Sequence, residues 1–330
     1  MIDSFVLLAP ILLLGVVALL GFVGCQWIVG TDFPPRHIHP KAVAGSSAKV
    51  TVSWNEVSDA DSYNVNQTGG PAPRTFKVVN ATAFTDTSVA IGTTYTYTVD
   101  AFQDTQQIAQ SAENVSATPG PITFQPPLAE TAETTVAASI KTPALANVAP
   151  RSLVVVWIYY NSTATTVQTV QDSSSPDQYQ PAAGPTTVMG AVSSFRQEIW
   201  YKNDVAGGPN FAVTATFSPS LNAVAAIVAH VYHTYDPTAT PEISRSATGS
   251  GSVASSGLVQ VDSAKLIFGA AIFLGGGGTP GTPEFRQRAT TNNNISEDED
   301  FDAPGTAEAT FNTVPSGSTQ DWIAQMVAFR

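Results

Sequence analysis

The stretch Ser152–Tyr160, SLVVVWIYY, decides the fold that we predict for this chain. It is apolar on both faces, as expected for a central strand that is covered on both sides. Within the chain that follows, Ala223–His230 also fits a helix, but its Val-rich surroundings favour a strand. The other strand-like runs that follow Ser152–Tyr160 are Phe195–Tyr201, Phe211–Phe217, Leu258–Val261, Ala264–Leu274, Ala307–Phe311 and Asp321–Phe329. Residues 120–330 are therefore expected to form one large two-sheet sandwich.

A second, smaller module is predicted upstream of this region, over residues 41–119. Val50, Val52 and Trp54 alternate with polar residues, which is the period of a half-buried strand. Further short strand-like runs are Tyr63–Val65, Phe76–Val78, Tyr95–Ala101 and Val115–Ala117. Several short strands separated by turns are typical of a small sandwich.

The smaller module resembles a bacterial fibronectin type III domain. The resemblance rests on Val50–Trp54, Ala60–Val65, Gly92–Val99 and Ser116–Pro119. It implies that Trp54 is the core tryptophan. It also implies that Tyr95 is the corner tyrosine, with a buried ring and a hydroxyl bonded to the backbone. Domains of this family are spacers or binding modules.

The larger module resembles the jelly-roll, concanavalin-like sandwiches of bacterial surface proteins. The resemblance rests on Leu153–Tyr160, on Ile199–Tyr201 followed by Gly207 and Gly208, and on Asp321–Arg330. Many such modules bind carbohydrate, so exposed aromatic side chains are the expected contacts. The candidates are Tyr159, Tyr160, Trp200 and Tyr201. Adjacent residues of a strand point to opposite faces, so one residue of each pair can lie on the surface and contact a ligand. Packing in the core or against a sheet face is the alternative.

The N-terminal run Phe5–Gly24, FVLLAPILLLGVVALLGFVG, is uncharged. A helix of about 20 apolar residues is long enough to cross a bilayer, so residues 1–30 are predicted to be an anchor or signal and 31–40 a tether. A lipoprotein signal is an alternative, because Phe22–Cys25 resembles a bacterial lipobox in which Cys25 is acylated. A cleaved secretory signal and a hydrophobic assembly segment are the others.

The composition restricts the partners of the protein. The net charge is −12 and the chain has 14 Lys and Arg residues, which argues against nucleic acid because phosphate binding needs basic clusters. The single cysteine excludes an intramolecular disulfide and a cysteine-based metal site. Charged residues make up only 12% of the chain, so hydroxyl groups are expected on the solvated strand faces.

The densest group of carboxylates, at 297–302, is predicted to be a loop because it lies between Asn292–Asn294 and Pro304. Asp298, Asp300 and Asp302 alternate within it, as the oxygen ligands of a calcium loop do. A solvated acidic turn is the alternative. Glycosidases of the jelly-roll family carry paired carboxylates on a strand, and we expect no such pair and no enzymatic activity.

These features predict an all-β protein with an N-terminal hydrophobic helix, a fibronectin type III-like sandwich and a jelly-roll-like head. The predicted function is that of a non-enzymatic, membrane-tethered cell-surface protein that displays its head for adhesion or carbohydrate binding. The alternative is a structural subunit of a surface filament or layer, assembled through the hydrophobic helix. Calcium is the one cofactor that the sequence suggests.

Overall fold

The computed structural model describes residues 36–45, 47–136, 138–190, 194–236, 238–301 and 304–330. These residues are all-β and contain no helix. Accordingly, none of the described residues belongs to a helix that is long and apolar enough to cross a membrane. The helix predicted over Phe5–Gly24 lies outside the described residues, as does Cys25. For the described residues the fold class is therefore corrected to all-β, without a helical part.

The first module is a sandwich of two sheets with a fibronectin type III-like strand arrangement. One sheet has the order β2-β3-β6 and the other the order β1-β8-β7-β4-β5, with β9 also paired to β7. The strands are β1 (Arg36–Ile38), β2 (Lys41–Ala44), β3 (Val50–Ser53), β4 (Ser62–Thr68), β5 (Arg74–Val79), β6 (Ala83–Asp86), β7 (Tyr95–Gln103), β8 (Gln106–Ser111) and β9 (Val115–Ala117). Strand β1 lies in the segment that was predicted to be a tether.

The core of this module confirms the roles that the resemblance implied for Trp54 and Tyr95. Trp54 is buried and its ring centroid lies 5.3 Å from that of Tyr63. Tyr95 is buried, and its hydroxyl accepts a hydrogen bond from the backbone N–H of Ala90 at 3.0 Å. Because this bond ties the turn before β7 to the core, Tyr95 acts as a corner tyrosine.

Residues 122–234 form a first jelly roll. Its strands pair in a nested way, with β10 on β20, β11 on β19 and β12 on β18. The sheets have the orders β10-β20-β13-β17-β16 and β11-β19-β14-β15. The strands are β10 (Ile122–Val136), β11 (Ser139–Lys141), β12 (Leu145–Val148), β13 (Ser152–Asn161), β14 (Thr166–Asp172), β15 (Ser175–Gln178), β16 (Gln180–Met189), β17 (Ser194–Val205), β18 (Gly208–Phe211), β19 (Val213–Ser218) and β20 (Ala223–Thr234).

Residues 241–330 form a second jelly roll with the same plan. Here β21 pairs with β30, β22 with β29, β23 with β28 and β24 with β27. The sheet orders are β21-β30-β24-β27-β26 and β22-β29-β25. The strands are β21 (Pro241–Gly251), β22 (Val253–Ser255), β23 (Val259–Val261), β24 (Leu266–Leu274), β25 (Gly277–Pro280), β26 (Arg286–Thr291), β27 (Asn294–Asp300), β28 (Gly305–Ala307), β29 (Thr310–Val314) and β30 (Gln320–Phe329).

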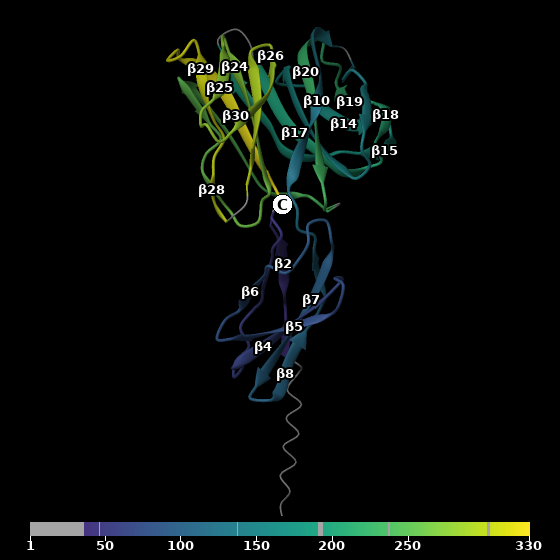
Figure 1. Ribbon diagram of the computed structural model, residues 1–330. Coiled ribbons are helices and arrows are strands. Elements are labelled where there is room, and N and C mark those ends of the chain that lie inside the picture. The colour runs from purple at the N-terminus through teal and green to yellow at the C-terminus, as the bar shows by residue number, and fades with distance from the viewer. Residues whose placement is uncertain (1–35, 46, 137, 191–193, 237, 302–303) are drawn as a thin grey trace, which may run out of the picture. The chain divides into compact units, whose positions relative to one another are not determined.

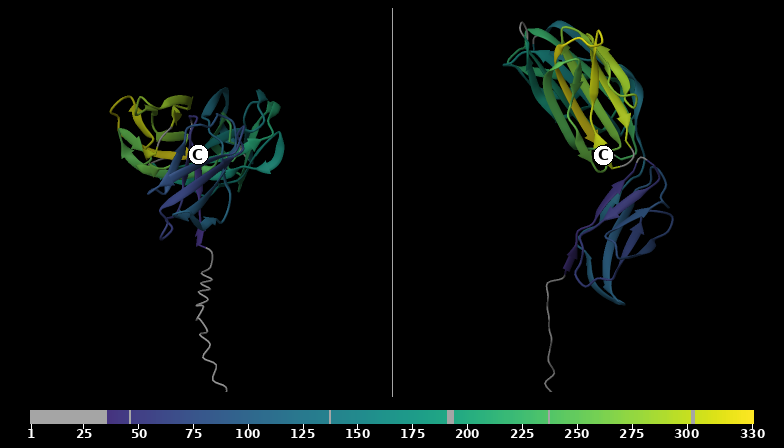
Figure 2. Two further views of the ribbon diagram at one scale, coloured as in Figure 1. Left: turned by 60° about the horizontal axis from the view of Figure 1, so that its bottom comes forward. Right: turned by 90° about the vertical axis from the view of Figure 1, so that its left-hand side faces the viewer.

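The single large sandwich predicted for residues 120–330 is therefore wrong. In both rolls the first strand pairs with the last strand of the same roll, so each roll closes its own pair of sheets. The teal and green strands of the first roll and the yellow-green strands of the second are separate layers in Figures 1 and 2. The matching strand orders indicate an internal structural repeat, and Ala-Thr-Phe occurs at corresponding places, 215–217 and 309–311.

The five-stranded sheets of the two rolls pack face to face, and we call the layer between them the seam. Strand β13 supplies side chains to both of its sides. Val154 and Val156 belong to the interior of the first roll, whereas Val155 and Trp157 belong to the seam. From the second roll, Phe268 enters the seam. The run Ser152–Tyr160 is thus buried on both faces, as predicted, because a second roll covers the face that a lone sandwich exposes.

Candidate functional site

A pocket of about 560 Å³ lies where the two rolls meet, and we call it the tip pocket. It lies at the end of β24 where Leu274 pairs with Asp321, opposite the end where Leu266 pairs with Phe329. Its walls come from strands far apart in the sequence. The described side chains that give it its chemistry are Tyr159, Phe195, Phe273, Asn292, Asn293 and Asp321.

The amide rim of the tip pocket is formed by the two-residue turn between β26 and β27. Asn292 and Asn293 have φ angles of 51° and 65°, so both adopt the left-handed conformation of a type I′ hairpin turn. Asparagine tolerates this conformation better than most residues. Both side chains are exposed. The next residue, Asn294, is buried and accepts a hydrogen bond from the Phe273 N–H at 2.8 Å, which fixes the turn to β24.

The floor of the tip pocket is aromatic and rigid. Tyr159 is 1% exposed, and its hydroxyl donates to the carbonyl oxygen of Thr291 at 2.8 Å. Burial raises the pKa of Tyr159 to about 12, so the hydroxyl is a neutral donor at physiological pH. The hydroxyl of Thr291 in turn donates to Glu130 Oε2 at 2.6 Å. Phe273 is buried and Phe195 half-buried. The pocket therefore combines an aromatic floor with a rim of two exposed amides and the half-buried carboxylate of Asp321.

Of the four aromatic residues predicted to contact a ligand, only Tyr159 lines the tip pocket. Tyr160 and Trp200 are buried in the first roll, which corrects the prediction that they contact a ligand. Their polar atoms bind a buried carboxylate: the Tyr160 hydroxyl donates to Glu198 Oε1 at 2.6 Å, and Trp200 Nε1 donates to Oε2 at 2.9 Å. Tyr201 is half-buried at the seam, 5.8 Å from the ring of Phe329.

Residues 297–300 of the predicted acidic loop belong to a strand, because β27 extends to Asp300. Asp298 is buried and accepts hydrogen bonds from Tyr232 of the first roll at 2.9 Å and from Arg288 at 2.7 Å to each oxygen. Its oxygens are thus already occupied by donors. Asp302, the third proposed calcium ligand, lies outside the described residues. The residues that the structure describes contain no group of three or more His, Cys, Asp or Glu that fits a metal ion.

Sequence analysis missed Glu297, which lies in the interior of the second roll. Its side chain is 0% exposed, and neither carboxylate oxygen has a hydrogen-bond partner among the described residues. Burial raises its pKa to about 9, with a further contribution from the charges of Asp298 and Glu299. Strand alternation within β27 places Glu297 and Glu299 on one face, a pairing that the loop prediction had excluded.

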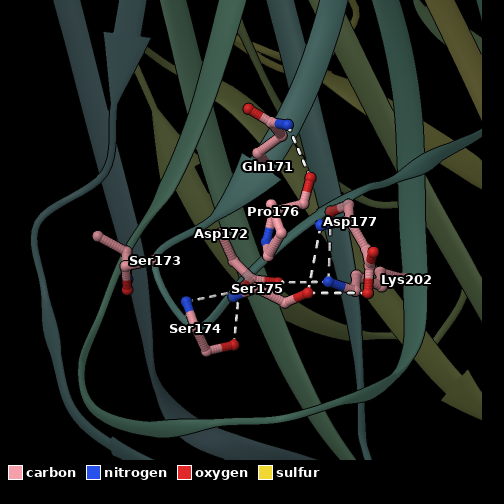
Figure 3. Close-up of polar contacts among 9 residues, drawn as sticks. Gln171, Asp172, Ser173, Ser174, Ser175, Pro176, Asp177 and Lys202 are labelled. Carbon is pink, nitrogen blue, oxygen red and sulfur yellow. Dashed lines mark hydrogen bonds and ion pairs between the residues drawn. The ribbon is translucent and has the colours of Figure 1, made fainter.

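A second polar cluster closes the turn between β14 and β15 (Figure 3). The buried Asp172 carboxylate accepts hydrogen bonds from Ser174 Oγ at 2.6 Å and from the Ser175 N–H at 3.0 Å. Lys202 Nζ lies 3.1 Å from its other oxygen. Burial opposes the charge of Asp172, but the Ser174 bonds and Lys202 outweigh it and lower its pKa overall. The donors and acceptors satisfy one another, so this cluster anchors the turn.

No family model matches the chain. Over 75 residues it is 41% identical to a poly(3-hydroxybutyrate) depolymerase from Ralstonia pickettii. The matched segment covers 23% of this chain and 14% of that enzyme. A solved Fn3-like protein from Clostridium thermocellum has 31% identity over 24% of this chain and 90% of its own, with a TM-score of 0.21. An archaeal virus structure described as a triple jelly roll with turret assembly has 10% identity over 87% of this chain and 83% of its own, with a TM-score of 0.20.

Proposed function

We propose that this protein is a non-enzymatic cell-surface protein whose double jelly-roll head binds neutral carbohydrate in the tip pocket. The observation that carries the proposal is the pairing of an aromatic floor with two exposed amide groups and a half-buried carboxylate. Sugars present apolar C–H faces that pack on aromatic rings and hydroxyl groups that need polar partners at the rim. The half-buried ring of Phe195 and the amides of Asn292 and Asn293 supply both kinds of contact.

The test is saturation-transfer NMR of the full-length protein with a panel of neutral oligosaccharides. Glycine at both Asn292 and Asn293 removes the amide groups while keeping the left-handed backbone that the turn requires. We expect this double variant, and separately Asp321→Asn, to weaken binding at least tenfold. Asn210→Gly is the matched control, because Asn210 is also exposed and has a φ of 55°.

Two outcomes would reject the carbohydrate proposal. One is the absence of binding to every neutral sugar of the panel. The other is binding that the double glycine variant leaves unchanged, because the sugar would then sit elsewhere. Release of 3-hydroxybutyrate from its polymer by the purified protein would contradict the non-enzymatic part of the proposal.

The surface location rests on the apolar run Phe5–Gly24 at the N-terminus. We propose that this segment holds the chain at a membrane and leaves the modules free in the surrounding medium. Membrane fractionation of the full-length chain against a chain lacking residues 1–30 tests this. The full-length protein is expected in the membrane fraction and the shortened chain in the soluble fraction. Oligomers that persist in the shortened chain would instead favour a filament or layer subunit whose contacts lie in the sandwiches and not in the hydrophobic segment.

A further inference from the structure

A second hollow, of about 320 Å³, lies between β10 of the first roll and β26 of the second, and we call it the arginine pocket. Its described lining is Thr123, Phe124, Pro126, Arg286, Arg288 and Asp300. Two guanidinium groups in one small hollow are notable in a chain with 14 basic residues and a net charge of −12. The hollow shares no lining residue with the tip pocket.

Arg288 is fixed in this hollow from two sides. Its Nε and Nη2 each lie 2.7 Å from an oxygen of the buried Asp298, which is a bidentate pair. Its Cζ lies 4.4 Å from the ring centroid of Phe124, a cation–π distance. The hydroxyl of Tyr232 holds Asp298 in place at 2.9 Å. The charge of Arg288 is therefore part of a rigid wall.

Arg286 forms the accessible side of the hollow, with 47% of its side chain exposed. Its Nη2 lies 2.8 Å from Asp300 Oδ1, and Asp300 is itself 49% exposed. A guanidinium group has five N–H donors, and the contacts of Arg286 with Asp298 and Asp300 leave several of them unused. The carboxylate of Asp300 thus marks a position at which an anionic group binds Arg286. An anionic ligand can displace Asp300 from this position.

We propose that the arginine pocket binds the carboxylate of an acidic sugar, such as a uronic acid unit of a polysaccharide. The planar fork of Arg286 suits a carboxylate, since it offers parallel N–H donors that match the two oxygens. The hydroxyl of Thr123 and the remaining guanidinium N–H groups provide partners for sugar hydroxyls. The ligand carboxylate takes the place of Asp300, whose exposed ion pair is weak enough to be exchanged.

The experiment compares methyl glucuronide with methyl glucoside, which differ only in the carboxylate, by saturation-transfer NMR on the full-length protein. In the arginine pocket we expect the glucuronide alone to bind, with an affinity that falls as salt is added. Any binding of the neutral glucoside should come from the tip pocket and be lost in the Asn292 and Asn293 glycine variant. Arg286→Gln should weaken binding at least tenfold. Asp300→Asn should strengthen it, because the competing charge is removed. Arg245→Gln, an exposed arginine on β21, is the control and should change nothing.

Three results would overturn the proposal. One is equal binding of the glucoside and the glucuronide to the Asn292 and Asn293 glycine variant, and another is no glucuronide binding to either the wild-type chain or Asp300→Asn. The third is equal binding of N-acetylglutamate amide, which would assign the pocket to acidic peptides. The Asn292 and Asn293 glycine variant should leave glucuronide binding intact, so that failure of this site and failure of the tip pocket are distinguishable.

Discussion

Replacement of Glu297 with glutamine isolates the cost of one buried ionisation. The two side chains have nearly the same shape, and a glutamine cannot ionise. The folded state raises the pKa of Glu297 from 4.5 to about 9, because the carboxyl is buried without a hydrogen-bond partner among the described residues. Its contribution to stability is therefore present in full below pH 4.5. It is lost as the pH rises towards 9, because the unfolded chain releases the proton and the folded chain retains it.

The magnitude follows from this difference in pKa. Each pH unit between the two values costs about 1.4 kcal/mol, so at pH 7 the free energy of unfolding is lowered by about 3 kcal/mol. We expect Glu297→Gln to be more stable than the wild type by this order at pH 7, and by much less at pH 4.5. The assay is amide hydrogen exchange in β24 and β27 from pH 4.5 to pH 8, which reports opening of the second roll.

Glu133→Gln provides the control, because Glu133 is exposed on β10 and its loss should change stability by less than about 0.5 kcal/mol. Parallel stability curves for the wild type and Glu297→Gln across this pH range would refute the reasoning. They would mean that the Glu297 carboxyl is hydrated or paired in solution, so that its ionisation in the folded state is not costly.

Three further predictions concern the packing of the modules. Asp298→Asn should destabilise the head by about 3–5 kcal/mol, since it removes the buried charge that pairs with the half-buried Arg288. The exposed Asp300→Asn should cost less than about 1 kcal/mol, and differential scanning calorimetry compares the two variants. Trp54→Ala should cost about 3–5 kcal/mol through the cavity it leaves, and unchanged amide exchange in β3 and β4 would contradict its core role. Millimolar calcium should leave the melting temperature as it is in EDTA, because arginines occupy Asp298; a rise abolished by Asp300→Asn would restore the calcium site.

Local sequence pattern was sufficient for many of the strands and for the sandwich fold of the first module, but it did not predict β10, β14, β16 or β21. Alternation of apolar and polar residues determines which face of a strand is buried, and this period can be read without knowing the partner strand. Trp54 and Tyr95 were identified because a fibronectin type III-like core depends on a few large side chains at local positions. Ser152–Tyr160 was correctly predicted to be buried on both faces, because its apolar residues do not alternate with polar ones.

The candidate sites depended on tertiary structure. The tip pocket combines Tyr159 of β13 with Asn293 of the β26–β27 turn, and no local pattern predicts that these segments meet. The reading of the acidic run as a loop failed because consecutive carboxylates are expected to be solvated. In the fold, Glu297 points into the second roll, whereas Asp298 reaches Tyr232 and Arg288 at the seam.

The sequence alone determined that the described chain is built from strands, that a small sandwich precedes a larger head, and which strand in that head is covered on both sides. Tertiary structure decided that the head is two jelly rolls. A strand buried on both faces has the same sequence whether its second face meets its own sandwich or a neighbouring one. Only the pairing of β10 with β20 and of β21 with β30 distinguishes these cases, because strand pairing is made between backbones and leaves little trace in side-chain pattern.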